Sequence, residues 1–269
     1  MMKYCLVCKN PIQIATKTRQ VIHHLSKNVP AFFYPRCFYQ LMQLLLCEKC
    51  VSNTILLLKH ICKMCGRACA GQPELCRDCS RHREGLKGNR SVIQYNEWAK
   101  DVIKQWKYQG DERLYSICAT LILLGYRFHY GLRRRIDLIS YVPMHRIRLQ
   151  ERGFNQAQKL AEYVGYHQKI PCVPLWERQK ETEKQSKQKG RAARFESMQD
   201  AFVIHPSLHT TSHCFQPFSI WPKKTSWHVL IVDDIFTTGA TIEACAKVLS
   251  YYAKKQNLQL SVCSLTLAR

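Results

Sequence analysis

Acidic residues are scarce in this chain of 269 residues. It has 19 Asp and Glu against 41 Lys and Arg, so its formal net charge at pH 7 is +22. Such an excess of one sign indicates a polyanionic partner: nucleic acid, anionic lipid or a phosphorylated ligand. Hydrophobic residues make up 46% of the chain and aromatic residues 10%, which suffices for a core and excludes disorder of the whole chain.

Long apolar runs are also lacking. The first residues carry no apolar stretch of the kind found in secretory signals. The longest apolar run, Ile117 to Leu124, is far shorter than the roughly 20 residues that span a bilayer. We therefore expect a soluble cytoplasmic protein without a membrane span. In that compartment clustered cysteines bind metal or take part in catalysis rather than form disulfides.

The cysteines divide the chain into two unequal parts. Ten of the 15 lie at or before Cys79, and the charged stretch 80–90, with two glycines, has the composition of a linker. We predict a cysteine-rich zinc-binding domain with its linker over 1–90 and a second domain over 91–269.

Strand-like and helix-like segments alternate in the second part, which predicts an α/β fold with a mostly parallel sheet flanked by helices. The predicted strands are 91–95, 136–142, 228–232 and 258–267, and the predicted helices are 97–108, 112–130, 155–164 and 239–253. Two polar stretches interrupt the alternation. We predict a mobile basic loop at 177–194 and an insertion loop at 205–227.

Four Cys-x-x-Cys pairs precede the linker. Two intervening residues let a tight turn aim both sulfurs at one ion, and two pairs supply the four thiolates of a tetrahedral zinc site. Eight ligands predict two structural zinc ions. The spacing leaves open whether the pairs combine in sequence order or interleave, first with third and second with fourth. The predicted ligands are Cys5, Cys8, Cys47, Cys50, Cys62, Cys65, Cys76 and Cys79.

The other cysteines are predicted not to bind metal. Cys37 and Cys69 fall outside the pair spacing. Four more lie in apolar contexts and are expected in the core rather than as nucleophiles. These are Cys118, Cys172, Cys245 and Cys263.

The segment 229–241 has the most informative chemistry. Four apolar residues predict a buried strand, and Asp233 and Asp234 stand at its C-terminal end, where open α/β sheets bind ligands. A hydroxyl-rich loop then runs into a helix and offers backbone N–H groups to a phosphate. The carboxylates would suit the hydroxyls of an attached sugar, or a magnesium ion. The loop consists of Thr237, Thr238, Gly239, Ala240 and Thr241.

An apolar strand followed by two Asp residues also occurs in P-loop nucleotide hydrolases, but their G-x-x-x-x-G-K-[ST] motif is absent here. The segment instead resembles the phosphoribosyl-diphosphate motif of type I phosphoribosyltransferases. This resemblance implies that Asp233 and Asp234 contact ribose hydroxyls and that the loop 237–241 holds the 5′-phosphate. It also implies that magnesium accompanies phosphoribosyl diphosphate.

Other segments are similar to the ComF family of competence-associated proteins, and specifically to its ComFC branch. They are the leading cysteine pairs, Asn-Arg-Ser-Val near position 90, Lys107 to Asp111, Glu151-Arg152-Gly153-Phe154-Asn155-Gln156-Ala157, and Lys184-Gln185-Ser186-Lys187 before Arg194. The likeness covers nearly the whole chain. It implies a type I phosphoribosyltransferase fold, an amino-terminal zinc finger and a role in moving single-stranded DNA during natural transformation. A DNA-translocating helicase is the partner that it implies.

The sequence departs from the family pattern at three places. The second proline of the usual Val-Pro-x-Pro is replaced in Val142-Pro143-Met144-His145. The basic loop lacks the usual Leu after Gln-Ser, and the stretch 205–227 is longer than the family's connection.

Three arginines follow the predicted strand 136–142. Arg146, Arg148 and Arg152 would neutralise a diphosphate if that strand ends beside Asp233. We favour Arg152 with Gly153 as ligand contacts, because the glycine permits close approach of the backbone.

Two functions follow from these residues. The first is a factor that handles single-stranded DNA and carries a pocket for phosphoribosyl diphosphate or a related sugar phosphate. The alternative is an active phosphoribosyltransferase with an unknown acceptor, for which no side chain is identified as the general base. A transcriptional regulator is disfavoured, because no helix-turn-helix signature is found.

Overall fold

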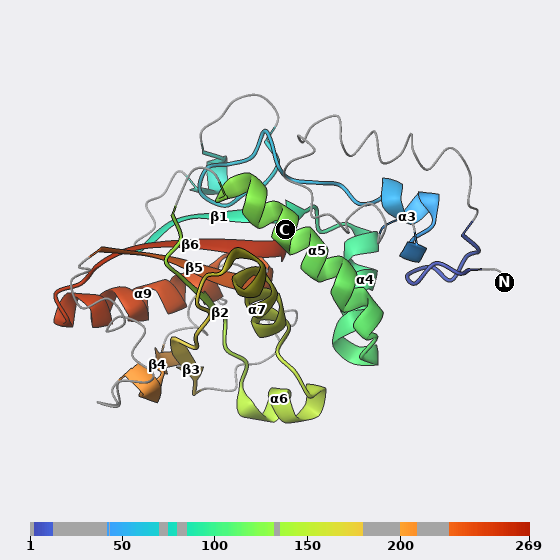
Figure 1. Ribbon diagram of the computed structural model, residues 1–269. Helices are drawn as coiled ribbons and strands as arrows, with labels where there is room; N and C mark the ends of the chain where they lie inside the picture. Colours follow the sequence, from blue (N-terminus) through green and yellow to red (C-terminus); the bar gives the residue numbers. More distant parts are fainter. Residues whose placement is uncertain are drawn as a thin grey trace.

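The fold is described from a computed structural model for residues 3–12, 42, 44–69, 75–79, 85–131, 135–179, 200–208 and 226–269. Its centre is a four-stranded sheet with the order β1-β6-β5-β2, in which all neighbouring strands are parallel (Figure 1). The strands are β1 Leu86–Ile93, β2 Leu138–Tyr141, β5 Ser226–Ile235 and β6 Gln259–Ala268.

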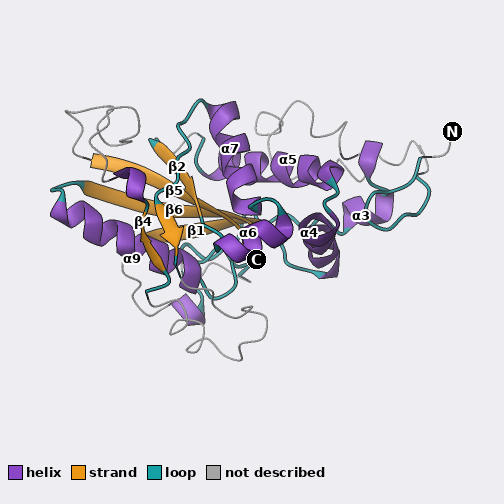
Figure 2. Ribbon diagram, turned by 90° about the horizontal axis from the view of Figure 1, so that it is seen from below, coloured by secondary structure: helices purple, strands orange, loops and turns teal. Residues whose placement is uncertain are grey.

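Helices cover both faces of this sheet (Figure 2). Helix α5 (Glu112–His129) packs on β1 and β6, and α7 (Gln156–Gln168) packs on β2 and β5, while α9 (Ala240–Lys255) packs against β6 from the other side. The side chains of successive residues in β5 point to opposite faces of the sheet. Leu230 and Val232 join the core with α5 and α7, whereas Val229 and Ile231 join the core with α9. The predicted α/β fold with a parallel sheet flanked by helices is thus confirmed.

Capping residues fix the helices that follow the strands. Helix α4 (Glu97–Gln109) begins after Asn96, whose side chain accepts a 2.9 Å hydrogen bond from the backbone N–H of Ala99. It ends at Gly110, which has the left-handed φ of 63° that favours glycine. Because only three residues separate β1 from α4, the helix lies beside the carboxyl end of the sheet.

The first strand begins earlier than its apolar residues predicted. Strand β1 starts at Leu86, inside the stretch 80–90 that was predicted as a linker. The strand starts there because of tertiary contacts of Asn89, which is fully buried. Its amide donates to Ser91 Oγ at 2.8 Å and accepts from Ser264 Oγ at 2.9 Å. A strand held by buried polar contacts carries no hydrophobic alternation.

Part of each predicted loop is regular structure. Glu177 and Arg178 belong to β3 (Trp176–Arg178), which pairs antiparallel with β4 (Phe202–Ile204). The predicted insertion loop 205–227 includes a 3-10 turn at Pro206–Leu208 and the start of β5. Strands of three residues show no period in a sequence, which explains the error. Residues 180–199 and 209–225 lie outside the described part.

The cysteine-rich part packs directly on the edge of the sheet. Leu57 N–H donates to Val92 O at 2.8 Å and Gln94 N–H donates to Ile55 O at 2.9 Å, so the segment 55–57 runs along β1. This segment covers an edge that would otherwise expose unpaired backbone groups. Among the described residues, no helix has the length and apolar character of a membrane span.

Candidate functional site

The acidic pair lies where the sequence predicted, at the carboxyl end of β5. Asp233 Oδ1 accepts a 2.9 Å hydrogen bond from the backbone N–H of Asp234, which fixes the two carboxylates relative to each other. The side chain of Asp234 is only 14% exposed. Both carboxylates therefore face a partly desolvated space at the edge of a parallel sheet, where ligands bind in folds of this kind.

The loop after β5 leads directly into α9. Gly239 takes the left-handed φ of 89° at the N-terminal cap of the helix, and the backbone N–H of Ala240 donates to Thr238 Oγ1 at 3.3 Å. The loop is also held from the chain terminus, because Arg269 Nη1 donates to Thr237 O at 3.0 Å. The N–H groups in the first turn of this 16-residue helix give the loop a partial positive charge suited to an anion.

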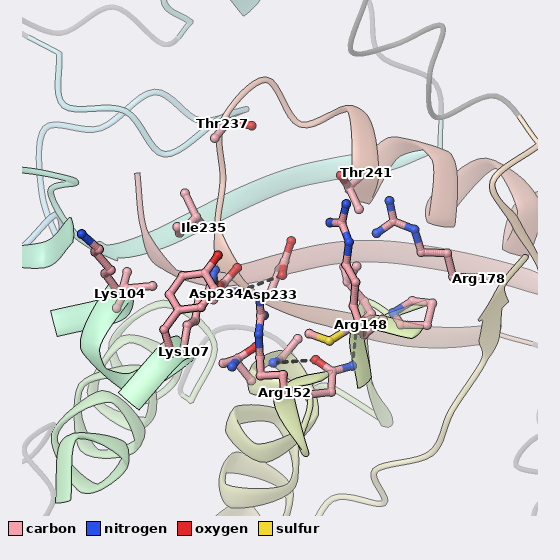
Figure 3. A pocket seen from close by; sticks show the side chains of 18 of the residues that line it. Lys104, Lys107, Arg148, Arg152, Arg178, Asp233, Asp234, Ile235, Thr237 and Thr241 are labelled. Atoms are coloured by element: carbon pink, nitrogen blue, oxygen red, sulfur yellow. Dashed lines mark hydrogen bonds and ion pairs between the residues drawn. The ribbon is translucent and has the colours of Figure 1, made fainter. Parts of the chain in front are cut away.

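A cavity of about 620 Å³ opens between these groups (Figure 3). Its polar lining combines the two carboxylates with six cationic side chains from three different parts of the chain. Figure 3 shows Lys104 and Lys107 on α4 at one side of the acidic pair, and Arg148 and Arg178 at the other. The six cations are Lys100, Lys104, Lys107, Arg148, Arg152 and Arg178.

The cavity includes some of the predicted ligand contacts and leaves out others. Those that line it are Asp233, Asp234, Thr237, Thr241 and Arg152, and those that do not are Thr238, Gly239, Ala240 and Gly153.

Gly153 has a conformational role that differs from the predicted one. It ends α6 (Arg146–Arg152) with a φ of 80°, and a Cβ placed there would meet no atom within 4 Å. The glycine is thus required by the left-handed backbone and not by a close approach of any described atom.

Lys107 is a site residue that the sequence reasoning missed. It forms an ion pair with Asp234 Oδ2, although the two residues come from α4 and β5. The signal was nevertheless present: Lys100, Lys104 and Lys107 follow one another at spacings of four and three within a predicted helix, which places them on one face.

The environment shifts the pKa values of the two carboxyl groups in opposite directions. Burial, followed by the charge of Asp234, raises the pKa of Asp233 well above its ordinary value. Burial also acts to raise the pKa of Asp234, but the ammonium group of Lys107 outweighs it and lowers that pKa. The pair together with Lys107 therefore carries less negative charge than two free carboxylates would.

The segment Arg152 to Ala157 links the cavity to α7. Asn155 caps the helix by accepting from Ala157 N–H at 3.0 Å, and its amide donates to Val142 O at 3.0 Å. Arg152 Nη1 donates to Gln156 Oε1 at 2.8 Å, and its guanidinium lies 5.3 Å from the centre of the Tyr108 ring. Gln156 lines the cavity at 2% exposure, and its Nε2 has no hydrogen-bond partner among the described residues. An oxygen atom of a bound ligand could accept the hydrogen bond that this Nε2 group offers.

Of the other arginines predicted as ligand contacts, one lines the cavity and one does not. Arg148 lines the cavity, whereas Arg146 is absent from its lining and pairs with Glu177 Oε1 at 2.8 Å. The family likeness of the predicted mobile loop rests on Gln185, Ser186 and Arg194, and these residues lie outside the described part of the chain.

The eight paired cysteines form two clusters in sequence order, which decides between the two arrangements. We call Cys5, Cys8, Cys47 and Cys50 the first cluster, and Cys62, Cys65, Cys76 and Cys79 the second cluster. Within each cluster all sulfur atoms lie within 4.8 Å of one another.

The spacing of the sulfur atoms fits a tetrahedral metal ion. The distances from Cys5 to Cys50, from Cys8 to Cys47 and from Cys65 to Cys76 are 3.6, 3.5 and 3.7 Å. A tetrahedron with Zn–S bonds of about 2.3 Å has edges of about 3.8 Å. The hydrogen bond between Cys5 and Cys50 lowers the pKa of Cys5 to about 4 and raises the pKa of Cys50. Each cluster could thus hold one divalent ion, which would replace the protons of its thiol groups.

Where the structure describes them, the remaining cysteines lie outside the two clusters. Cys69 lies outside both clusters. Cys118, Cys245 and Cys263 are buried, and Cys172 is half-buried against the core. Burial raises the pKa of Cys172 to about 12, which disfavours its thiolate form. Cys37 lies outside the described residues.

Comparison with known proteins agrees with the motifs quoted above. No family model matches the chain. It is 28% identical to Competence protein ComFC of Bacillus subtilis over 83% of both chains. It is 29% identical to Competence protein ComFC of Streptococcus pneumoniae over 65% of this chain and 68% of that one, and 25% identical to Competence protein F of Haemophilus influenzae over 70% and 77%. This similarity extends along most of the chain and supports its resemblance to the ComF family.

Proposed function

We propose that the protein is a competence-associated factor that handles single-stranded DNA during natural transformation. We further propose that its cavity binds phosphoribosyl diphosphate or a related sugar phosphate. The names of the relatives in Bacillus subtilis and Streptococcus pneumoniae support the competence role. The net charge of +22 supports a nucleic-acid partner.

One arrangement carries the ligand half of this proposal: the acidic pair, the start of α9 and the cationic side chains line a single cavity. A sugar phosphate needs all three. Carboxylates accept hydrogen bonds from ribose hydroxyls, the N–H groups of a helix start bind a phosphate, and arginine binds diphosphate oxygens in a forked geometry. No single one of these groups would select such a ligand.

Calorimetric titration with phosphoribosyl diphosphate tests the ligand half. We expect binding by the wild type and a loss of about tenfold or more in affinity, equivalent to about 1.4 kcal/mol, for the double variant Asp233→Asn with Asp234→Asn. Asp200→Asn is the control, because Asp200 is exposed and does not line the cavity. Equal affinities of the wild type and the double variant would refute this assignment.

Filter-binding of a single-stranded oligonucleotide tests the DNA half. Binding through phosphates releases counterions, so the logarithm of the affinity should fall linearly with the logarithm of the salt concentration. An affinity that does not change with salt would refute backbone binding. Pull-down with a DNA-translocating helicase, in the presence and absence of DNA, tests the partner that the family resemblance implies.

Two structural zinc ions are the cofactors that we propose, one in each cluster. The four sulfur donors, their spacing and their closed geometry support zinc in a structural and not a catalytic role. Elemental analysis of protein purified under reducing conditions should give two zinc ions per chain. Protein that is folded and free of metal would contradict the assignment.

An active phosphoribosyltransferase is the second candidate. Tyr95 and Tyr108 line the same cavity as Asp233 and offer aromatic surface to an acceptor base. In this reaction the bond from ribose C1 to diphosphate breaks, and the acceptor forms the new bond to C1. Sustained release of diphosphate in the presence of candidate bases, abolished by Asp234→Asn, would favour the enzyme over a binding factor.

A further inference from the structure

Lys107 is held firmly at the acidic pair. Its side chain is 18% exposed, and that of its partner Asp234 is 14% exposed, so water screens their ion pair little. The helix beneath it is anchored by Trp106, which is 2% exposed and lies 5.9 Å from the ring of Phe154 and 6.0 Å from that of Tyr115. Lys107 is therefore placed by the fold and is not a mobile surface lysine.

The described cavity does not suit a free magnesium ion. Mg²⁺ demands about six oxygen ligands in octahedral geometry and is usually bound through one or two carboxylates together with waters and substrate phosphates. Here Asp234 is paired with Lys107, and Asp233 Oδ1 already accepts a hydrogen bond from Asp234 N–H. Six cationic side chains line the cavity against these two carboxylates, so a dication would enter a space with an excess of positive charge.

We propose that Lys107 takes the place of a divalent cation at the acidic pair, so that the cavity binds its sugar phosphate without magnesium. The inference rests on the proposed function, because it assumes that phosphoribosyl diphosphate is bound. The ammonium group keeps the carboxylates beside an anionic ligand from repelling it. The arginines and lysines of the lining supply the charge that a metal ion would bring to the phosphates.

A purely structural ion pair that ties α4 to β5 is the competing explanation. It would make Lys107 important for stability but would leave the magnesium dependence of ligand binding unchanged. The response to magnesium thus separates the two explanations, and the melting temperature alone does not.

The experiment measures the affinity for phosphoribosyl diphosphate by calorimetry, in chelator and in excess Mg²⁺ at matched ionic strength. For the wild type we expect affinities within about threefold in the two buffers. For Lys107→Met we expect a loss of about tenfold or more in chelator that excess Mg²⁺ largely restores, since one lost ion pair of about 1.4 kcal/mol corresponds to tenfold. Lys247→Met, on the exposed side of α9 and away from the cavity, is the control and should behave like the wild type.

Two outcomes would overturn the inference. One is a wild type that needs Mg²⁺ for most of its affinity, and the other is a Lys107→Met variant with the same response to Mg²⁺ as the wild type. Lys107→Arg keeps the positive charge, so it provides a test if the Met variant does not fold. It should bind phosphoribosyl diphosphate with equal affinity in both buffers. If the wild type binds the ligand in neither buffer, the proposed function fails as well, which is a different result from binding that depends on magnesium.

Discussion

The two cysteine clusters differ in what they hold in place. The second cluster is joined to the sheet by its own backbone: Met64 O accepts from Asn89 N–H at 2.7 Å, and Cys65 O accepts from the Asn89 amide at 3.2 Å. The first cluster instead faces helices. Gln105 on α4 donates to Val7 O at 3.2 Å, and Cys5, Leu6 and Val7 pack in the core that α4 and α5 share.

This difference assigns a separate structural task to each cluster. The second cluster belongs to the edge of the sheet, where a Cβ on Gly66 would already lie 3.0 Å from Asn89 O. The first cluster supports α4, the helix that brings Lys104 and Lys107 to the cavity. Loss of metal from the second cluster should therefore affect the fold, and loss from the first should affect the site.

Cys65→Ser should have the largest effect. Structural zinc contributes about 10–16 kcal/mol to folding in finger peptides, which is as large as the whole stability of a typical domain. We expect loss of one metal ion and loss of cooperative thermal unfolding, measured by elemental analysis and circular dichroism. Cys69→Ser is the matched control, because this cysteine lies near the second cluster but outside it. It should keep two metal ions and the melting temperature of the wild type. A Cys65→Ser protein with the same two properties would contradict the claim that the second cluster supports the fold.

Cys8→Ser should spare the sheet and weaken the site. Cys8 is the exposed member of the first cluster, so its replacement disturbs little packing beyond the metal. We expect one metal ion per chain and a cooperative melting transition. We also expect an affinity for phosphoribosyl diphosphate lowered about tenfold, or about 1.4 kcal/mol, because α4 loses its support. An unchanged affinity in a protein with one metal ion would show that the first cluster does not position the cavity lysines.

The sequence predicted those parts of the fold that local patterns encode. Apolar β5 and the spaced apolar residues of α5 and α7 showed the α/β alternation. Helix α6 was missed because none of its seven residues is buried, so it has no hydrophobic period. The start of β1 was missed because Asn89 holds it through contacts with residues far along the chain.

In the candidate site, too, the local motifs were predictable and the long-range contacts were not. Asp233, Asp234 and the loop 237–241 adjoin one another in the chain, so their resemblance to a ligand-binding motif was visible in the sequence. The ion pair of Lys107 with Asp234 and the pairing of the cysteines depend on tertiary structure, which spacing does not encode. The eight cysteines of the two clusters were nonetheless identifiable individually, because each pair is a local turn.

Asn89→Ala should destabilise the protein by about 2–4 kcal/mol in the free energy of unfolding. The change leaves the buried Cys65 O and Ser264 Oγ without this partner, and each unsatisfied buried group costs about 1–3 kcal/mol. Urea denaturation measures the change, and both metal ions should remain bound in native buffer. A loss below about 1 kcal/mol would mean that the second cluster is less closely joined to the sheet than its contacts indicate.

Gln105→Ala should have the smallest effect. It removes one partly buried hydrogen bond to Val7 O, worth about 0.5–1.5 kcal/mol, while the better helix propensity of alanine returns a few tenths of a kcal/mol. We therefore expect a net loss of about 1 kcal/mol or less by urea denaturation, with two metal ions retained and the ligand affinity lowered less than in Cys8→Ser. Since Gln105 does not line the cavity, any fall in affinity would have to pass through the position of α4. A fall as large as that of Cys8→Ser would instead identify this one hydrogen bond as the main link between the first cluster and the site.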